Sequence, residues 1–345
     1  MALSSRTATA SALCNALLSI AAFHHLGRAA ALPYKIKALS QLSHSVSASA
    51  NDSPPEDVNT QLAACLMLCM YSVFDREEGN WHIHLKGAQE ILHNPRLQLM
   101  PKLTSDFLIA WFLYYDVLAN FTQPAQKNSI TEEQYLVRML DISKIDTSAI
   151  VGSLGCSVEL FEAIHHINHL HAFCKGHIPW LVTSTVLQRR IELGSQLRHL
   201  VQHLDPDEEK IATAPRRTQA LATAELYRLA ALLYLQRIYP IHEDDGSRIT
   251  HLEEGFCALE TLSVASSPWP VFILACESQT ETQRITILRR LDDMESMRGI
   301  GNILVMRDII EKVWKQNDLR QTTNPGEQFS WCQFVESGNA VPWFV

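Results

Sequence analysis

Apolar residues recur along most of this chain with the spacing of one face of an α-helix. Within residues 62–73 they stand at positions i, i+3, i+4, i+7 and i+11, which are occupied by Leu62, Cys65, Leu66, Cys69 and Val73. That spacing places all five side chains on a single stripe of a helix. Comparable patterns predict further helices at residues 107–118, 160–170, 187–204, 220–239, 252–264 and 303–314.

Local signals for helix ends agree with these patterns. Ser105 precedes the apolar segment 107–118 and is a suitable N-cap, and Asn94-Pro95 ends the helix before it. The alternation of apolar and polar residues that is typical of strands is almost absent. The sequence therefore predicts an all-α fold, an irregular array of about 10–14 helices with no significant sheet.

The segments between the predicted helices are short. Candidate loops lie at residues 47–55, 123–128, 205–217, 242–248 and 321–326. None of them is long enough to require a domain break. We therefore interpret residues 1–345 as a single helical domain.

The overall charge argues against direct contact with nucleic acid. Lys and Arg number 29 against 37 Asp and Glu, which gives a formal net charge of −8. A protein that grips a phosphate backbone usually carries a basic patch. The doublets Arg216-Arg217 and Arg289-Arg290 are isolated, and solvated helix ends explain them better.

The eight cysteines do not form a zinc-binding pattern. No two of them make a C-x2-C pair, and the closest spacing, Cys65 to Cys69, falls within the apolar stripe. A cysteine in such a stripe acts as a small hydrophobic residue. The scattered distribution is typical of a reducing compartment.

The N-terminus allows two interpretations. Its first 51 residues contain no Asp or Glu and are rich in Ser and Ala, as in an organelle transit peptide. Against that interpretation, Leu13, Leu17 and Ile20 share one helical face, and a second helical segment follows at residues 34–42. No apolar run reaches the roughly 18 residues of a membrane span, and we expect no membrane partner.

One group of side chains has the chemistry of metal ligands. Glu162, His165 and His169 lie near one face of a predicted helix at i, i+3 and i+7, and such a set is capable of holding zinc. The H-E-x-x-H motif is absent, so a polar or half-buried helix face is the favoured alternative, and we expect no metal.

Signals for catalysis are weak. Asp292-Asp293-Met294-Glu295 lacks the D-D-x-x-D/E spacing with which all-α enzymes bind magnesium and a diphosphate. G-x-S-x-G, P-loop and G-x-G-x-x-G motifs are also absent. We expect no enzyme activity, and an all-α diphosphate-processing enzyme stays a third hypothesis.

An ordered set of short motifs resembles a known family. The segment LAACLMLCMYSVFD at residues 62–75 is followed by GNW at 79–81 and by HLKGA at 84–88. Further pieces follow the same order, with ALLSIAAFH at 16–24, YKIKAL at 34–39, YYDVL at 114–118, ELYRLA at 225–230 and SPWPVFILACE at 267–277. Together they resemble the fungal-specific transcription factor domain of the second type, which is the regulatory region of fungal zinc-cluster regulators.

The resemblance marks nine residues, to which we assign structural roles. They are Asp75, Gly79, Asn80, Trp81, Gly87, Asp116, Arg228, Trp269 and Trp314. Gly79-Asn80 is suited to a turn and a helix cap, with Trp81 packed beneath it. Asp116 and Arg228 stand in apolar helices, and a buried charge there requires a partner of opposite charge or a capping role.

The resemblance implies a nuclear transcriptional regulator that works through protein partners or self-association, and that has a possible small-molecule effector. If an effector site exists, we expect it between helices, with residues 111–115 (Trp111 to Tyr115) in its wall. Family members usually carry a six-cysteine zinc cluster before this domain, whereas the sequence as printed starts at the family's first helix. Zinc and DNA binding are therefore expected only through an absent N-terminal module or a partner. The alternative function is a stand-alone interaction protein that modulates full-length relatives.

Overall fold

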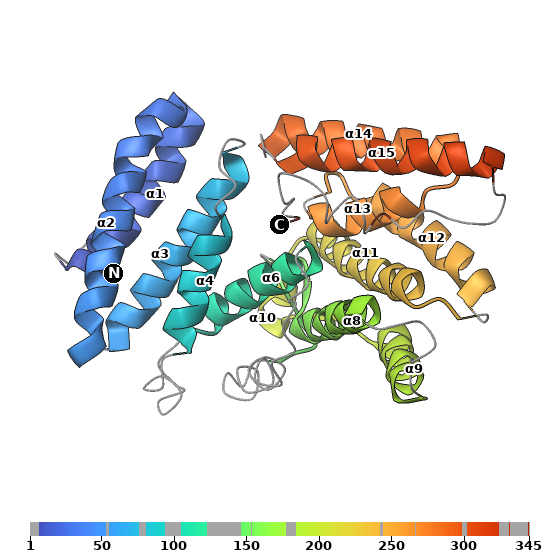
Figure 1. Ribbon diagram of the computed structural model, residues 1–345, viewed down its shortest axis with the longest axis horizontal. Helices are drawn as coiled ribbons and strands as arrows, with labels where there is room; N and C mark the ends of the chain where they lie inside the picture. The colour runs from blue at the N-terminus through green and yellow to red at the C-terminus, as the bar shows by residue number, and fades with distance from the viewer. Residues whose placement is uncertain are drawn as a thin grey trace. The chain divides into compact units, whose positions relative to one another are not determined.

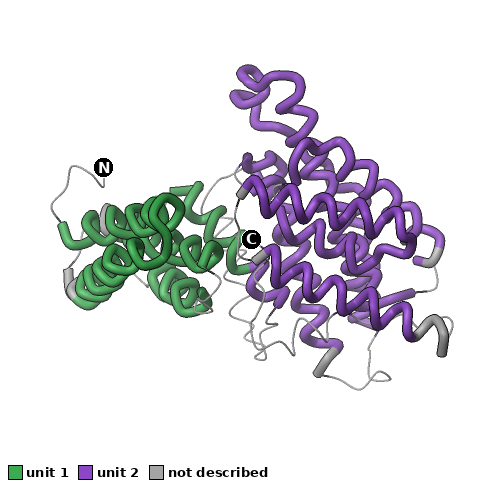
Figure 2. The backbone as a smooth tube through the Cα atoms, turned by 90° about the horizontal axis from the view of Figure 1, so that it is seen from above, with its two compact units in different colours: residues 1–116, 134–145 green, residues 117–133, 146–345 purple. Residues whose placement is uncertain are grey.

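The computed structural model of the chain describes residues 7–52, 55–75, 81–93, 105–122, 146–152, 154–176, 184–241, 244–265, 267–298, 302–323, 331 and 344. Within these ranges the chain forms thirteen helices and one small sheet (Figure 1). The predicted all-α class is therefore confirmed. The chain divides into two compact units, residues 1–116 with 134–145 and residues 117–133 with 146–345 (Figure 2). The interpretation as one domain stays a prediction.

The described part of unit 1 consists of helices. Its described elements are α1 (Ala8–Leu26), α2 (Arg28–Asp52), α3 (Pro55–Phe74), α4 (Trp81–Leu92) and the first part of α6 (Asp106–Thr122). The Thr7 side chain caps α1 by accepting a hydrogen bond from the amide of Ala10 at 3.2 Å. Gly27 ends α1 with a φ of 87°, a left-handed conformation that favours glycine.

Small side chains allow α1 and α2 to pack closely along their length. Ala12, Ala16 and Ser19 of α1 are buried, as are Ala31 and Ala38 of α2. Helix α1 is also long and apolar enough to satisfy the length and composition of a membrane span. A core helix of a folded unit satisfies the same test, and here α1 packs against α2 and α3.

The apolar stripe of α3 forms the core of unit 1. All five residues that the spacing placed on one face, Leu62, Cys65, Leu66, Cys69 and Val73, are buried. Burial raises the pKa of the Cys65 thiol to about 12, so this side chain stays neutral at physiological pH. The two cysteines of the stripe therefore pack as small hydrophobic residues.

Unit 2 surrounds the long helix α11. Its helices are α8 (Val158–Gly176), α9 (Ser184–His199), α10 (Pro206–Ile211), α11 (Ala214–Ile238), α12 (Asp244–Thr261), α13 (Pro268–Glu277), α14 (Glu281–Arg298) and α15 (Asn302–Thr323). Helix α11 contacts α8, α9, α12 and α13. Every residue of α13 is buried, so this helix forms the centre of the unit.

Unit 2 also contains a three-stranded sheet, β1 (Ala149–Val151), β2 (Cys156–Ser157) and β3 (His203–Leu204), in the order β2-β1-β3. Strands β1 and β2 are antiparallel, with Ile150 opposite Ser157, whereas β1 and β3 are parallel. Gly155 turns between β1 and β2 with a φ of 83°, and a Cβ there would lie 2.9 Å from Thr223 Cγ2. Glycine is therefore required at this turn.

Two buried ion-pair groups join the helices of unit 2. Glu277 at the end of α13 accepts hydrogen bonds from Arg237 Nε and Nη2 of α11 at 2.7 and 2.6 Å, and a further bond from Arg248 of α12. Arg190 of α9 pairs with Asp244 at the start of α12. Burial alone would raise the pKa of Glu277. The positive charges of Arg237 and Arg248 outweigh that effect, so the pKa of Glu277 lies below its ordinary value.

We expect Glu277→Gln to lower the free energy of unfolding of the chain by about 3 kcal/mol at pH 7, because two buried cations lose their counter-charge. Urea denaturation followed by circular dichroism measures the change. Asp308→Asn is the control, because Asp308 pairs with Lys312 on the surface at 2.6 Å and such pairs contribute less than about 1 kcal/mol.

The same pair of proteins tests the pH dependence. A carboxylate with a lowered pKa stabilises the fold fully above its unfolded pKa, near 4.3, and this contribution is lost as the pH falls further. The difference between wild type and Glu277→Gln should therefore shrink below that pH. A difference that stays constant from pH 7 to pH 3 would contradict the assigned ion pairs.

Candidate functional site

The marked residues of unit 1 hold the ends of its helices together. Asp75 is buried just after α3 and accepts hydrogen bonds from Arg28 Nε at 2.9 Å and from the Tyr71 hydroxyl at 3.4 Å. Burial, followed by the adjacent carboxylate, raises the pKa of Tyr71 to about 12. Asp75 therefore connects the start of α2 to the end of α3.

The next marked residues lie where α3 meets α4. Trp81 begins α4 and is buried, and its carbonyl oxygen accepts a hydrogen bond from Cys69 Sγ at 3.7 Å. A Cβ at Gly87 would meet Cys65 Sγ at 3.7 Å, which is ordinary contact. Gly79 and Asn80 lie outside the described residues, so the predicted turn and cap stay predictions.

The predicted need for a partner is met at Arg228, whereas the role of Asp116 stays a prediction. The guanidinium of Arg228 donates to Glu225 Oε2 and Oε1 at 2.8 and 2.6 Å, and to the carbonyl of Leu197 at 3.1 Å. A carboxylate thus partners this half-buried arginine, as the burial argument requires. Asp116 is partly buried on α6, and its pairing or capping role stays a prediction.

The two marked tryptophans of unit 2 occupy different environments. Trp269 is fully buried and stacks on Tyr227, with ring centroids 5.8 Å apart and an interplanar angle of 16°. Trp314 donates from Nε1 to the carbonyl of Ala275 at 2.7 Å and so joins α15 to α13. One face of the Trp314 ring lies beneath Arg284 of α14, at 5.4 Å.

Glu162, His165 and His169 do not come together as a metal site. Glu162 lies 3.9 Å from His166, and the His165 ring contacts the His169 ring at 4.3 Å between centroids. No group of three potential metal ligands occurs among the residues that the structure describes. His165 is buried, and burial, reinforced by the neighbouring histidines, lowers its pKa to about 2.

The acidic cluster of α14 is held in ion pairs. Asp292 pairs with Arg307 of α15, and Asp293 lies 3.8 Å from Arg290. Arginine partners offset the charge that a magnesium ion would otherwise balance. Neither aspartate therefore has the surroundings of a magnesium ligand.

The segment suggested for the wall of an effector site is buried inside unit 1. Trp111 and Tyr115 contact each other edge to face at 5.8 Å, and burial raises the pKa of Tyr115. Two grooves lined by described residues lie elsewhere, one between α14 and α15 and one between α11 and α12. An effector site walled by residues 111–115 stays a prediction.

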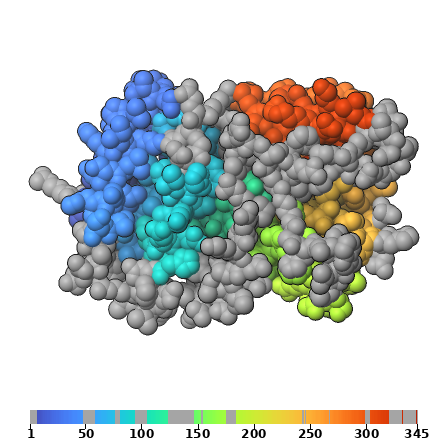
Figure 3. Space-filling view, in the orientation of Figure 1, coloured from blue at the N-terminus to red at the C-terminus, as the bar shows by residue number. Residues whose placement is uncertain are grey.

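The groove between α14 and α15 is the candidate functional site. Its volume is about 480 Å³. Side chains of α14 and α15 are visible on the surface of unit 2 (Figure 3). Ile285 and Leu319 are its exposed apolar residues, with 47% and 53% of their surfaces accessible. Trp314 lies at its base, and Glu311 and Lys315 stand on its rim. An apolar strip with charged edges suits the apolar face of a partner helix.

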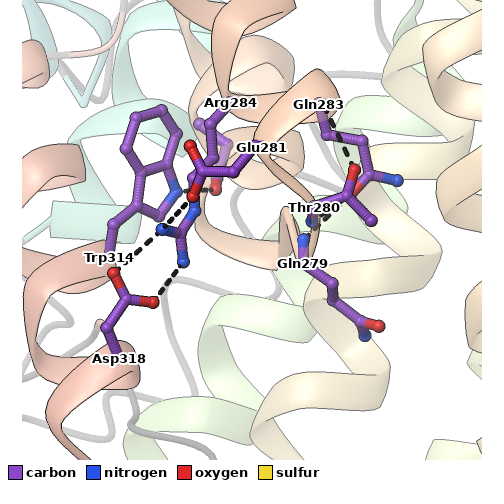
Figure 4. Close-up of polar contacts among 8 residues, drawn as sticks. Gln279, Thr280, Glu281, Gln283, Arg284, Trp314 and Asp318 are labelled. Carbon is purple, nitrogen blue, oxygen red and sulfur yellow. Dashed lines mark hydrogen bonds and ion pairs between the residues drawn. The ribbon is translucent and has the colours of Figure 1, made fainter.

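Arg284 joins the two helices that form this groove. Its guanidinium donates to Asp318 Oδ2 and Oδ1 at 2.9 and 2.6 Å and to Glu281 at 3.3 Å, while it lies over Trp314 (Figure 4). The hydrogen bond from Arg284 lowers the pKa of the Asp318 carboxyl. The bidentate pair and the indole stack clamp α14 onto α15.

The start of α14 is fixed by a capping box one residue before Arg284. The Gln283 side chain accepts hydrogen bonds from the amides of Gln279 and Thr280 at 2.8 and 3.1 Å, and Thr280 Oγ1 accepts from the amide of Gln283 at 3.3 Å (Figure 4). This reciprocal bonding is specific to the pattern S/T-x-x-E/Q at a helix start. It sets the position from which Arg284 reaches α15.

Sequence reasoning marked Trp314 and missed Arg284 and Asp318. The two partners are 34 residues apart in the chain, and no local spacing connects them. Thr280 to Gln283 carried the one usable signal, because a capping box places the first turn of a helix.

Comparison with known proteins agrees with the resemblance. Residues 1–344 match the family described as "Fungal specific transcription factor domain". The chain belongs to this family. It is similar to a protein of Pestalotiopsis fici (strain W106-1 / CGMCC3.15140) named "Transcription factor iacI", with 24% identity over 332 residues, which cover 93% of this chain and 80% of that protein. No solved structure matches the chain.

Membership gives the function class of this chain, which is transcriptional regulation. The family is one of transcription factor domains and not an enzyme family. The resemblance stated from the sequence motifs is therefore confirmed.

The buried His165 gives a pH-dependent prediction. The pKa of His165 in the folded state lies below its value of about 6.5 in the unfolded state. Below pH 6.5 the unfolded state therefore binds a proton that the folded state does not, and the free energy of unfolding falls with the pH. We expect the free energy of unfolding of the wild type to fall by about 2 kcal/mol more than that of His165→Leu between pH 7 and pH 5.

Urea denaturation at both pH values measures this difference. His199→Leu, at an exposed position, is the control and should follow the wild type. If the wild type and His165→Leu respond equally to pH, the His165 ring is not buried as the structure places it.

Proposed function

We propose that this chain is the protein-binding regulatory domain of a fungal zinc-cluster transcription factor, and that it acts in the nucleus. Membership of the family supports the regulatory role. The net charge of −8 disfavours contact of this segment with a phosphate backbone. DNA would then be reached through another module or through a partner protein, and the chain itself would need no cofactor.

The observation that carries this proposal is the groove between α14 and α15. It combines exposed Ile285 and Leu319 with a tryptophan and an arginine that are held in a fixed geometry. Aromatic and arginine side chains in a rigid setting are typical of the strongest contacts in protein interfaces. A partner helix that covers the groove would bury Ile285 and Leu319 without moving α14 or α15.

Reporter transcription tests the groove. The chain is fused to a heterologous DNA-binding domain, and its effect is the difference in reporter activity between the fusion and that domain alone. We expect the double variant Ile285→Glu/Leu319→Glu to lose at least about half of this effect, because two carboxylates would have to be desolvated in the interface.

The control is Ile211→Glu, which changes an apolar residue on α10 that is 80% exposed and lies outside the groove. Circular dichroism checks that all three proteins are folded. Full reporter effect in the double variant would remove the groove as the partner site, and no effect of the wild-type fusion would contradict the proposed function.

A further inference from the structure

A second groove runs between α11 and α12, which lie side by side in unit 2 (Figure 1). Its volume is about 590 Å³. It follows α12 from Thr250 to Thr261, which is roughly 16 Å or three helical turns. This length accommodates three turns of a partner helix.

The floor of the α11–α12 groove is apolar and made mostly of small side chains. Ala222 and Leu221 come from α11, and Cys257 and Ala258 come from α12. Small residues allow the backbone of a partner helix to approach closely, and the exposed Leu221 offers one larger apolar contact. Helix-in-groove recognition places the apolar face of an amphipathic helix on such a floor.

The rim of the same groove is acidic. It carries Glu225 from α11 and Glu253 and Glu254 from α12. Glu225 is paired with Arg228 at 2.6 Å, but within the described residues no Lys, Arg or His lies within ion-pair distance of Glu253 or Glu254. Glu254 interacts electrostatically with Arg228 and His251, but beyond ion-pair distance. The rim therefore holds three glutamates against the one arginine that pairs with Glu225, and it keeps a net negative charge.

The α14–α15 groove provides a contrast on the same unit. There, Arg284 and Lys315 stand among the acidic residues, and Arg284 binds Asp318 directly. A groove of similar size whose rim mixes both charges selects the charge of a partner only weakly, whereas an acidic rim around an apolar floor selects a basic partner.

We propose that the α11–α12 groove binds a basic amphipathic helix of a partner protein, whose apolar face lies on Ala222, Cys257 and Ala258 and whose Lys or Arg residues meet Glu253 and Glu254. This inference rests on the proposed function only in treating the chain as a protein-binding domain. Beyond the proposed function, it assigns a second binding surface and a positive charge to the partner of that surface.

Two synthetic peptides test the inference on the purified full chain. Each has 18 residues and the same Leu/Ala face, and the opposite face carries Lys and Arg in one peptide and Glu in the other. Fluorescence anisotropy measures binding, and peptide-resolved mass spectrometry measures the rate at which iodoacetamide alkylates Cys257, an exposed thiol on the groove floor.

We expect the basic peptide to bind with an affinity that falls with added salt, and to slow alkylation of Cys257. The acidic peptide should neither bind nor slow the alkylation. The double variant Glu253→Lys/Glu254→Lys should lower the affinity for the basic peptide by roughly tenfold or more. Glu281→Lys/Glu311→Lys at the other groove changes the net charge equally and should leave the affinity within about twofold, because distant surface charges are screened.

Equal weakening by the two double variants would show non-specific attraction to an acidic protein and would overturn the inference. Unchanged alkylation of Cys257 under saturating peptide would overturn it as well. The assay involves no transcription, so a chain that binds the peptide but leaves the reporter unaffected would contradict the proposed function alone.

Discussion

The carboxylate of Glu277 is the point on which the packing of unit 2 depends. It is buried, and among the described residues the guanidinium groups of Arg237 and Arg248 compensate for its lost hydration. Because those arginines belong to α11 and α12, one buried charge fixes three helices in relation to one another. An apolar contact would permit sliding, whereas the bidentate bond from Arg237 requires a defined orientation. This contact positions α11 and α12, which form one of the grooves described above. The helices of the other groove, α14 and α15, pack on α13.

This arrangement separates the buried centre of unit 2 from the two surfaces proposed for recognition. Helix α13 is completely buried, and the hydrogen bond from Trp314 to Ala275 joins α15 to it. Helix α14 is in turn joined to α15 by the pair of Arg284 and Asp318. The side chains left for partners stand on the outer faces of α12, α14 and α15, where they can differ in charge without disturbing the core. One fold can thus present a groove of mixed charge and a more acidic groove on the same unit.

The sequence predicted the parts of this structure that are encoded locally. The stripe from Leu62 to Val73 was recognisable because its five positions obey the helical period, and all five are buried. The strands of two or three residues were missed because they are too short to show alternation. The Arg284–Asp318 clamp and the partners of Glu277 were missed for another reason, since they join residues 29 to 40 positions apart. The α11–α12 groove likewise combines two segments whose relation exists only after folding.

The complete burial of α13 has a consequence for the nascent chain. Its run PVFILAC has high β-propensity and no charge before Glu277, and a helix of ten residues is marginal in water by itself. During synthesis this segment leaves the ribosome after α11 and α12, so both arginines are already present when Glu277 emerges. Until that carboxylate is bound, the apolar run is open to aggregation. Yield in a heterologous host should therefore be sensitive to chaperones that cover this segment.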